Sequence, residues 1–321
     1  MSDKNKNAET VLEENKNLDS NRGERKEQLE SPWKVTWRRL KKNRLSIIGL
    51  VMIVVIILLC IFGPTLFKLI KGYDFEANFV GLKYESPNLN FWFGTDNLGR
   101  DVFLRTLKGG QISLFVGISA VAVEVILGTI FGLIAGYYGG LVDNIIMRIV
   151  DVFMSIPSLP LLLILAAVLS DMNFPPQYRM FVVMFILGFL SWPGLCRMIR
   201  GQVLTIREQE YMQAAEALGI RDSKKMFRHI FPNVIPLIIV NATLGLGGMI
   251  LQESALSYLG LGVVPPTPTW GNLIQTVNDF YNLKNRPWLW VPPGVFIFLT
   301  VMAINLFGDG LRDALDPKLK K

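Results

Sequence analysis

EYMQAAEALGIRDSKKMFRHIFPN, residues 210–233, is a polar and strongly charged stretch enclosed by long apolar runs. Its first part, EYMQAAEAL, consists of good helix formers, and Gly219 follows where a left-handed residue would end a helix. Asp222 or Ser223 is placed to cap a second helix, KKMFRHIF, and Pro232 is placed to end it. The stretch therefore predicts two helices joined by a turn and inserted between hydrophobic segments.

The first of these helices has an apolar face with small residues at its centre. Tyr211, Ala214, Ala215 and Leu218 recur at positions i, i+3, i+4 and i+7, so they share one side of a helix. Such a face suits a groove of a partner protein, and it equally suits packing on the other helices of this chain. The pattern favours the partner.

The runs around this insert predict an all-α polytopic membrane protein. Hydrophobic residues make up 51% of the 321-residue chain, and each long run can cross the roughly 30 Å of hydrocarbon as a helix. The predicted spans are residues 45–67, 112–137, 145–169, 180–198, 234–252 and 294–307. Pro157 and Pro160 predict a kink or break in the third span.

The second span carries overlapping GxxxG patterns at Gly128, Gly132 and Gly136. Small residues at this spacing let helices approach closely inside a membrane. The pattern fits general packing within the bundle and a specific contact with another subunit equally well.

Lysine and arginine cluster before the first span, in the polar insert and in the C-terminal tail, which predicts that both termini and the insert are cytoplasmic. The basic residues of the long first outer loop run against this rule. The predicted organisation is a disordered cytoplasmic tail (1–31), a basic segment with the first span (32–67), an extracytoplasmic loop (68–110), a five-helix domain (111–310) holding the insert (201–232), and a cytoplasmic tail (311–321).

Composition also argues against several functions. The net charge of +7 is explained by cytoplasmic loops, so no nucleic-acid partner is expected. Cys60 and Cys196 are isolated, and His229 is the single histidine, so neither a metal centre nor a catalytic constellation is predicted. The chain has no GxxxxGK[ST] phosphate loop and is not expected to bind ATP. A proton-coupled carrier would normally show internal repeats and buried acid relays, and six spans with one large cytoplasmic helical insert fit that class poorly.

Three acidic residues lie in or beside apolar runs: Glu124, Asp151 and Glu253. Charges are costly inside a bilayer, so such groups face the bundle or water and line a cavity, form a gate or anchor hydrogen bonds. A structural anchor is favoured for Asp151 and Glu253, and both interpretations stay open for Glu124.

Before the second span stands FGTDNLGRDVF, residues 93–103, in which Thr95 or Asp96 is predicted to cap a helix and residues 97–99 to form a turn. Asp96, Arg100 and Asp101 either complete this turn or contact another protein.

The spacing AAxxxG, from Ala214 to Gly219, followed by IFP at residues 230–232, resembles the EAA motif of ABC importer permeases. Gln213 stands where that motif usually has glutamate. FGTDNLGRDVF, GLIAGYYGG, HIFPN, ESALSYLGLG and NLFGDGLRDALDPKL further resemble the C-type permease of oligopeptide and dipeptide importers, from about Trp33 to the C-terminus.

This resemblance implies a type I importer permease fold in a bacterial cytoplasmic membrane, with the insert as a coupling helix that docks in a cleft of an ATPase. The docking residues it implies are Glu210, Tyr211, Gln213, Ala214, Ala215, Glu216, Leu218, Gly219 and His229. It also implies a homologous second permease, two ATP-binding subunits that use ATP and Mg²⁺, and an extracytoplasmic peptide-binding protein. Asp96, Arg100 and Asp101 would contact the binding protein or the second permease. Oligopeptides are the favoured cargo, before dipeptides or a metal chelate.

Overall fold

A computed structural model describes residues 32–172 and 175–315, so the predicted tail 1–31 and the last six residues lie outside it. The described chain is helical. Its main helices are α2 (Pro32–Lys42), α3 (Arg44–Lys71), α4 (Val102–Tyr138), α5 (Gly140–Ser155), α6 (Ser158–Asp171), α7 (Pro176–Arg207), α8 (Glu210–Ala217), α9 (Asp222–Lys225), α10 (Phe231–Tyr258), α11 (Trp270–Ile274), α12 (Phe280–Asn285) and α13 (Val291–Leu315).

Within the described residues, five helices are long and apolar enough to cross a membrane: α3, α4, α7, the continuous helix from Asp222 to Tyr258, and α13. The pair α5 and α6 would make a sixth span, bent by 77°. The bend falls at Ile156 and Pro157, because proline cannot donate the backbone hydrogen bond that would continue α5. The predicted spans thus correspond to these five helices and the bent pair, and the predicted break in the third is confirmed.

Two helix boundaries differ from the hydropathy pattern for reasons of capping. Helix α4 begins at Val102 rather than at Ile112, because the Asp101 carboxylate accepts hydrogen bonds from the backbone N–H groups of Phe103 and Leu104. Neither Thr95 nor Asp96 caps this helix, which corrects the sequence prediction. Helix α3 likewise continues to Lys71, where Gly72 adopts a left-handed conformation (φ 77°).

The sequence predicts that Pro232 ends the second helix of the insert, but in the structure the helix continues past it. After α9 the backbone makes a π-helical turn, Met226–Ile230, in which the Phe231 N–H donates to the Met226 carbonyl, and α10 follows directly. A π turn shifts the hydrogen-bonding register and so accommodates a proline that donates none. The Asn233 side chain donates to the His229 carbonyl at 2.6 Å. The second helix of the insert is therefore continuous with α10, from Asp222 to Tyr258.

Helices α4 and α7 pack against each other along Gly128, Gly132 and Gly136, which we call the glycine stripe. Gly128 lies against Leu195, Gly132 against Ile199 and the Cys196 carbonyl, and Gly136 against Val203. The stripe thus serves close packing within this chain, because the absence of side chains lets the two backbones approach.

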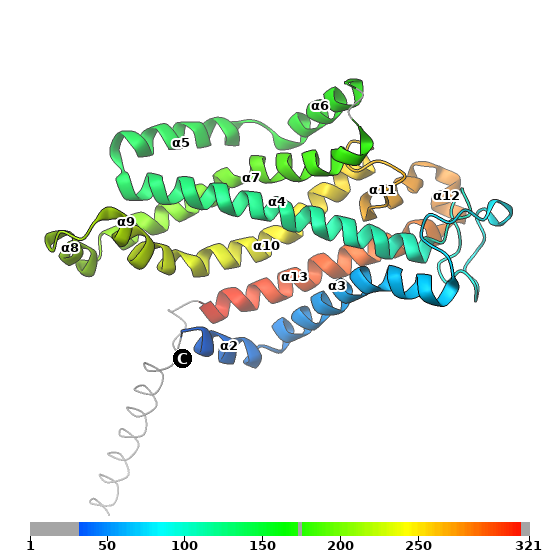
Figure 1. Ribbon diagram of the computed structural model, residues 1–321, viewed down its shortest axis with the longest axis horizontal. Helices are drawn as coiled ribbons and strands as arrows, with labels where there is room; N and C mark the ends of the chain where they lie inside the picture. The colour runs from blue at the N-terminus through cyan, green and yellow to red at the C-terminus, as the bar shows by residue number, and fades with distance from the viewer. Residues whose placement is uncertain (1–31, 173–174, 316–321) are drawn as a thin grey trace, which may run out of the picture.

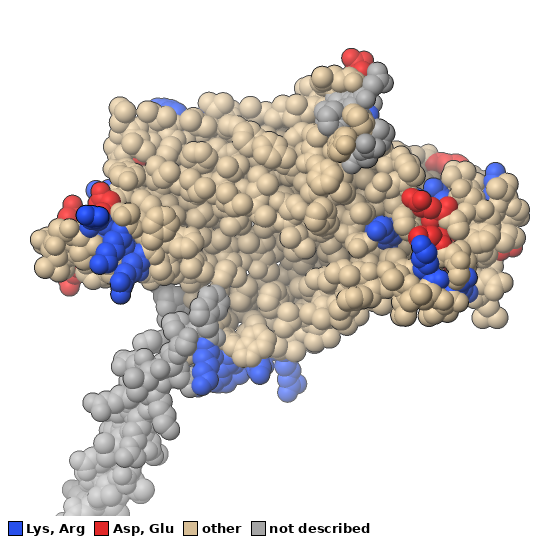
Figure 2. Space-filling model, in the orientation of Figure 1, with Lys and Arg blue, Asp and Glu red and all other residues tan. Residues whose placement is uncertain are grey.

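The ends of the bundle differ in content. Figure 1 shows α8 and α9 at one end, with α2 and the C-terminal end of α13 in the same half, while α11, α12 and the segment after α3 lie at the other end. Leu40 of α2 is buried with Leu311 and Ala314 of α13, which ties the two described ends of the chain together. On the face seen in Figure 2, charged side chains gather mostly toward the two ends, with a wide uncharged surface between them. This arrangement suits a membrane belt.

Candidate functional site

Helix α8 is short and its end is sharply defined. Gly219 is left-handed (φ 69°), its N–H donates to the Glu216 carbonyl, and the Ile220 N–H donates to the Ala215 carbonyl. These two bonds form a Schellman cap, and the predicted left-handed glycine is confirmed. The predicted cap of the second helix is wrong, however. Arg221 occupies the cap position of α9 with no side-chain hydrogen bond, and Asp222 is engaged elsewhere.

The apolar residues of α8 do not share one exposed face. Ala215 is 6% exposed and is buried with Met212 against this chain, whereas Leu218 is 79% and Tyr211 is 46% exposed. The reason is a rotation of the helix that the local pattern does not specify, since Met212 and Ala215 also stand three residues apart. The Ala215 side chain is therefore not available for contact with a partner, which corrects the predicted docking face. Ala214 remains exposed beside Tyr211 and Leu218.

The remaining predicted docking residues lie around this exposed side. Glu210 and Gln213 are exposed, and the Gln213 side chain donates to the Glu208 carbonyl at 3.3 Å. His229 is half-buried with its ring 6.4 Å from that of Tyr211. Phe227, on the π turn, is 67% exposed and adds a third large apolar side chain to the outer surface of the insert.

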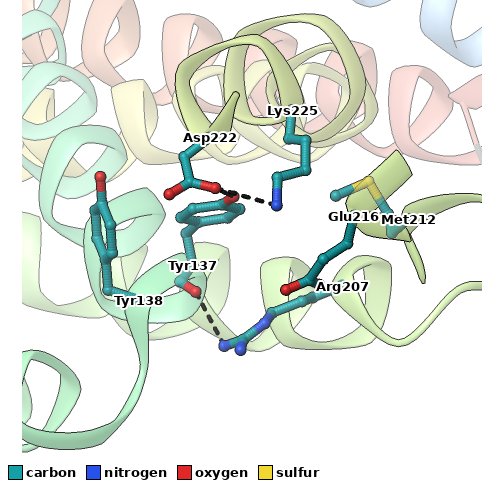
Figure 3. Close-up of a pocket in the computed structure, with 7 residues that line it drawn as sticks. All are labelled: Tyr137, Tyr138, Arg207, Met212, Glu216, Asp222 and Lys225. Atoms are coloured by element: carbon teal, nitrogen blue, oxygen red, sulfur yellow. Dashed lines mark hydrogen bonds and ion pairs between the residues drawn. The ribbon is translucent and has the colours of Figure 1, made fainter. Parts of the chain in front are cut away.

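A cluster of polar side chains ties the insert to the transmembrane helices. The Tyr137 hydroxyl, at the end of α4, donates to the Asp222 carboxylate at 2.6 Å, and Lys225 approaches the same carboxylate at 3.1 Å. Arg207, at the end of α7, donates to the Tyr137 carbonyl at 2.9 Å. These bonds join α4, α7 and α9 at one point, as Figure 3 shows.

The cluster borders a small cavity of about 170 Å³, lined also by Tyr138, Met212 and Glu216. Lys225 is buried although it carries a charge, with its ammonium group 5.8 Å from the centre of the Tyr137 ring. A buried lysine needs such partners, because removing its charge from water is otherwise costly. We call Tyr137, Arg207, Asp222 and Lys225 the anchor cluster.

At the opposite end, FGTDNLGRD folds back on itself. The Asp96 carboxylate accepts hydrogen bonds from the backbone N–H groups of Leu98 and Arg100 and from the Arg100 side chain at 2.7 Å. Gly99 is left-handed (φ 76°), so the turn predicted at residues 97–99 is confirmed. Asp101 is buried and accepts a hydrogen bond from the Tyr73 hydroxyl at 3.0 Å. Burial raises the pKa of the Asp101 carboxyl. The hydrogen bonds that this carboxyl accepts from Tyr73 and from the backbone N–H groups of Leu104 and Phe103 oppose the shift.

Glu253 is fully buried and joins three segments. Its carboxylate accepts hydrogen bonds from Ser257 at 2.7 Å and from Ser113 of α4 at 2.8 Å. Ser113 in turn accepts the backbone N–H of Trp270, the first residue of α11, at 3.2 Å. This network connects α4, α10 and α11, which supports a structural anchor.

The other two acidic residues of the membrane region differ from it. Asp151 forms an ion pair with Arg197 at 2.6 Å, and both side chains are about half exposed. Glu124 is half-buried, and no described residue hydrogen-bonds its buried Oε2 atom. Asp151 therefore fits the structural interpretation, while Glu124 stays a candidate for the transport path. Among residues 32–172 and 175–315, no cluster of three metal-binding side chains is found.

Two family models match the sequence. The model of the binding-protein-dependent transport system inner membrane component matches residues 128–321, and the model of the N-terminal TM domain of oligopeptide transport permease C matches residues 31–87. The chain belongs to the binding-protein-dependent transport permease family.

Relatives of this permease match it over almost their whole length. It is 40% identical to the dipeptide transport system permease protein DppC of Alkalihalophilus pseudofirmus, over 90% of this chain and 91% of the relative. It is 39% identical to the oligopeptide transport system permease protein OppC of Bacillus subtilis, over 91% of both chains. The glutathione transport system permease protein GsiD of Escherichia coli is 37% identical over 92% of this chain and 93% of its own.

Sequence reasoning placed the insert of this permease but missed the residues that hold it. Tyr137 and Arg207 were not singled out, nor was the ion pair in which Arg200 of α7 binds Asp143 of α5 through two nitrogens. A signal existed only for Tyr137, which lies in the phrase GLIAGYYGG. The partners of these residues are distant in the chain, so no spacing rule could pair them.

Proposed function

We propose that this chain is a pore-forming permease subunit of an ATP-driven importer of peptides, with the insert as the element that docks on a partner ATPase. The observation that carries the docking role is the exposure of Tyr211, Leu218 and Phe227 on an element that the anchor cluster ties to α4 and α7. Apolar side chains that protrude into water are unfavourable, and a group of them on a polar loop is typical of a surface that a partner protein covers.

Peptide cargo is supported by the relatives, whose names specify dipeptide, oligopeptide and glutathione transport. Oligopeptides are our preferred cargo, because a family model of oligopeptide transport permease C also matches the N-terminal region. Dipeptides are the second candidate, since the relative with 40% identity carries that name.

In the proposed mechanism this permease pairs with a homologous permease, and two ATPases bind beneath them in a bacterial cytoplasmic membrane. ATP with Mg²⁺ is bound and hydrolysed by the ATPases, and an extracytoplasmic binding protein delivers the peptide. Both termini and the insert face the cytoplasm. Closure of the ATPases displaces the insert. Helices α4, α7 and α10 move with the insert because they are bonded to it. The cavity between the two permeases then opens to the opposite side of the membrane.

The docking role predicts a large effect of Leu218→Asp. A charge at an exposed apolar contact should lower the affinity of the permease for its ATPase by about tenfold or more, because the carboxylate loses its water on docking. The measurement is the amount of ATPase that co-purifies with the permease at increasing dilution. The control is Leu89→Asp, which changes another strongly exposed leucine (92% exposed) at the opposite end. Undiminished ATPase recovery with Leu218→Asp would refute the docking surface.

The anchor cluster predicts that Tyr137→Phe loosens coupling without preventing assembly. The variant removes only the hydroxyl that binds Asp222, so the insert can move without carrying α4. The ratio of peptide imported to ATP hydrolysed should fall about twofold to tenfold. Tyr138→Phe is the control, because Tyr138 lines the same cavity and the structure shows no hydroxyl bond for it within the described residues. An unchanged ratio in reconstituted Tyr137→Phe transporter would contradict the role.

A further inference from the structure

A second cleft, of about 530 Å³, lies at the end of the bundle opposite the insert. One wall is the start of α4 with the turn before it, which contributes Asp96, Arg100 and Arg105. The facing wall is formed by neutral residues of the α10–α13 connection, namely Pro265, Pro266, Asn272, Leu273, Gln275, Thr276 and Leu289. A volume of this size accommodates the end of a short peptide, and a concave site with a few polar groups is typical of small-ligand sites.

The charges lining this cleft are unbalanced. Among the described residues that line the cleft, the acidic one is Asp96. Its carboxylate already accepts hydrogen bonds from the Arg100 side chain and from two backbone N–H groups. The Nε atom of Arg105 lies 3.6 Å from the Oδ2 atom of the same carboxylate, which is beyond hydrogen-bond distance. Glu76 also acts on Arg105 electrostatically, but its side chain is exposed and does not line the cleft. Two guanidinium groups thus share one carboxylate.

Arg105 is 3% exposed, and no described residue accepts a hydrogen bond from its Nε or Nη1. Buried charged donors without an acceptor are strongly unfavourable, so this arginine is preorganised for an anion that enters the cleft. A guanidinium presents parallel N–H donors that match the two oxygens of a carboxylate. A neutral ligand would leave the excess positive charge uncompensated.

We infer that this cleft binds the C-terminal carboxylate of the peptide cargo, with Arg105 as the principal donor. The inference rests on the proposed function, because it takes the cargo to be a peptide that arrives from the side opposite the ATPases. A terminal carboxylate is present in every peptide whatever its side chains, so one arginine serves a transporter that accepts many sequences. The far wall, with its prolines, leucines and Gln275, contacts the last residues without selecting among them.

The test measures direct binding of N-terminally labelled tetra-alanine to the purified permease–ATPase complex without its binding protein. Wild type should bind the peptide with a free C-terminus about tenfold or more tightly than its C-terminal amide. Arg105→Gln should bring this ratio close to one. Gln275→Trp, which fills the cleft from the facing wall and leaves both arginines in place, should weaken binding of the free peptide. Lys284→Gln removes an exposed charge from the same end and should change nothing.

Equal affinity of wild type for the two peptides would overturn the inference, as would a carboxylate preference that persists in both Arg105→Gln and Gln275→Trp. ATP-driven import of tetra-alanine by the wild-type complex with its binding protein is measured in parallel. Absence of import would refute the proposed function, whereas import without carboxylate preference would refute this inference alone.

Discussion

Replacing Gly132 by leucine is expected to abolish accumulation of the folded permease. A Cβ atom at this position would lie 2.8 Å from the Cys196 carbonyl oxygen and 2.8 Å from the Ile199 Cβ atom. Both are rigid parts of α7, so the helices must separate along the whole stripe. Overpacking of this kind costs about 1–3 kcal/mol when a core can adjust and more when backbones collide. The measurement is the yield of monodisperse protein after extraction in mild detergent.

Alanine substitutions make the same test quantitative. Alanine is favoured over glycine in a helix by about 1 kcal/mol, so Gly201→Ala on α7 should raise the midpoint of thermal unfolding, because nothing lies within 4 Å of a Cβ there. Gly132→Ala should lower the midpoint despite the same gain in helix propensity. If both alanine variants are stabilised alike, the close packing of α4 on α7 is not what the glycine stripe provides.

The second large effect is expected for Glu253→Ala. The variant leaves the hydroxyl groups of Ser113 and Ser257 buried without their acceptor. It also removes the carboxylate through which α10 holds Ser113, the residue that accepts the Trp270 N–H of α11. Each buried hydroxyl that is left without its acceptor costs about 1–3 kcal/mol, so the midpoint of thermal unfolding should fall by several degrees. The folded protein should also become sensitive to proteolysis in the connection that contains α11.

Glu124→Ala is the matched control for this effect. Both glutamates lie in membrane-spanning helices, but the Oε2 atom of Glu124 has no hydrogen-bond partner among the described residues. Its removal should leave thermal stability unchanged or slightly raised, since an unsatisfied buried polar atom is lost. A comparable loss of stability in both variants would show that membrane position, and not the hydrogen-bond network, accounts for the effect.

Several features could be predicted from the residues because neighbours in the chain determine them. Long apolar runs specify membrane helices whatever their partners, since a backbone in lipid must satisfy its own hydrogen bonds. Pro157 interrupts the third span through its missing donor, and Gly219 ends α8 because a left-handed conformation suits glycine. Pro232 shows the limit of such local rules, because the π turn before it lets the helix continue.

Local pattern thus established the membrane class, the order of the spans and the position of the polar insert between α7 and α10. The rotation of α8 that buries Ala215 and exposes Leu218 came only from the folded chain, as did the bond between Tyr137 and Asp222 and the excess of arginine around Asp96. Tyr137 and Asp222 stand 85 positions apart, and no periodicity relates them. Helix formation depends on residues a few positions away, whereas the burial of a face or a charge depends on which distant helix lies against it.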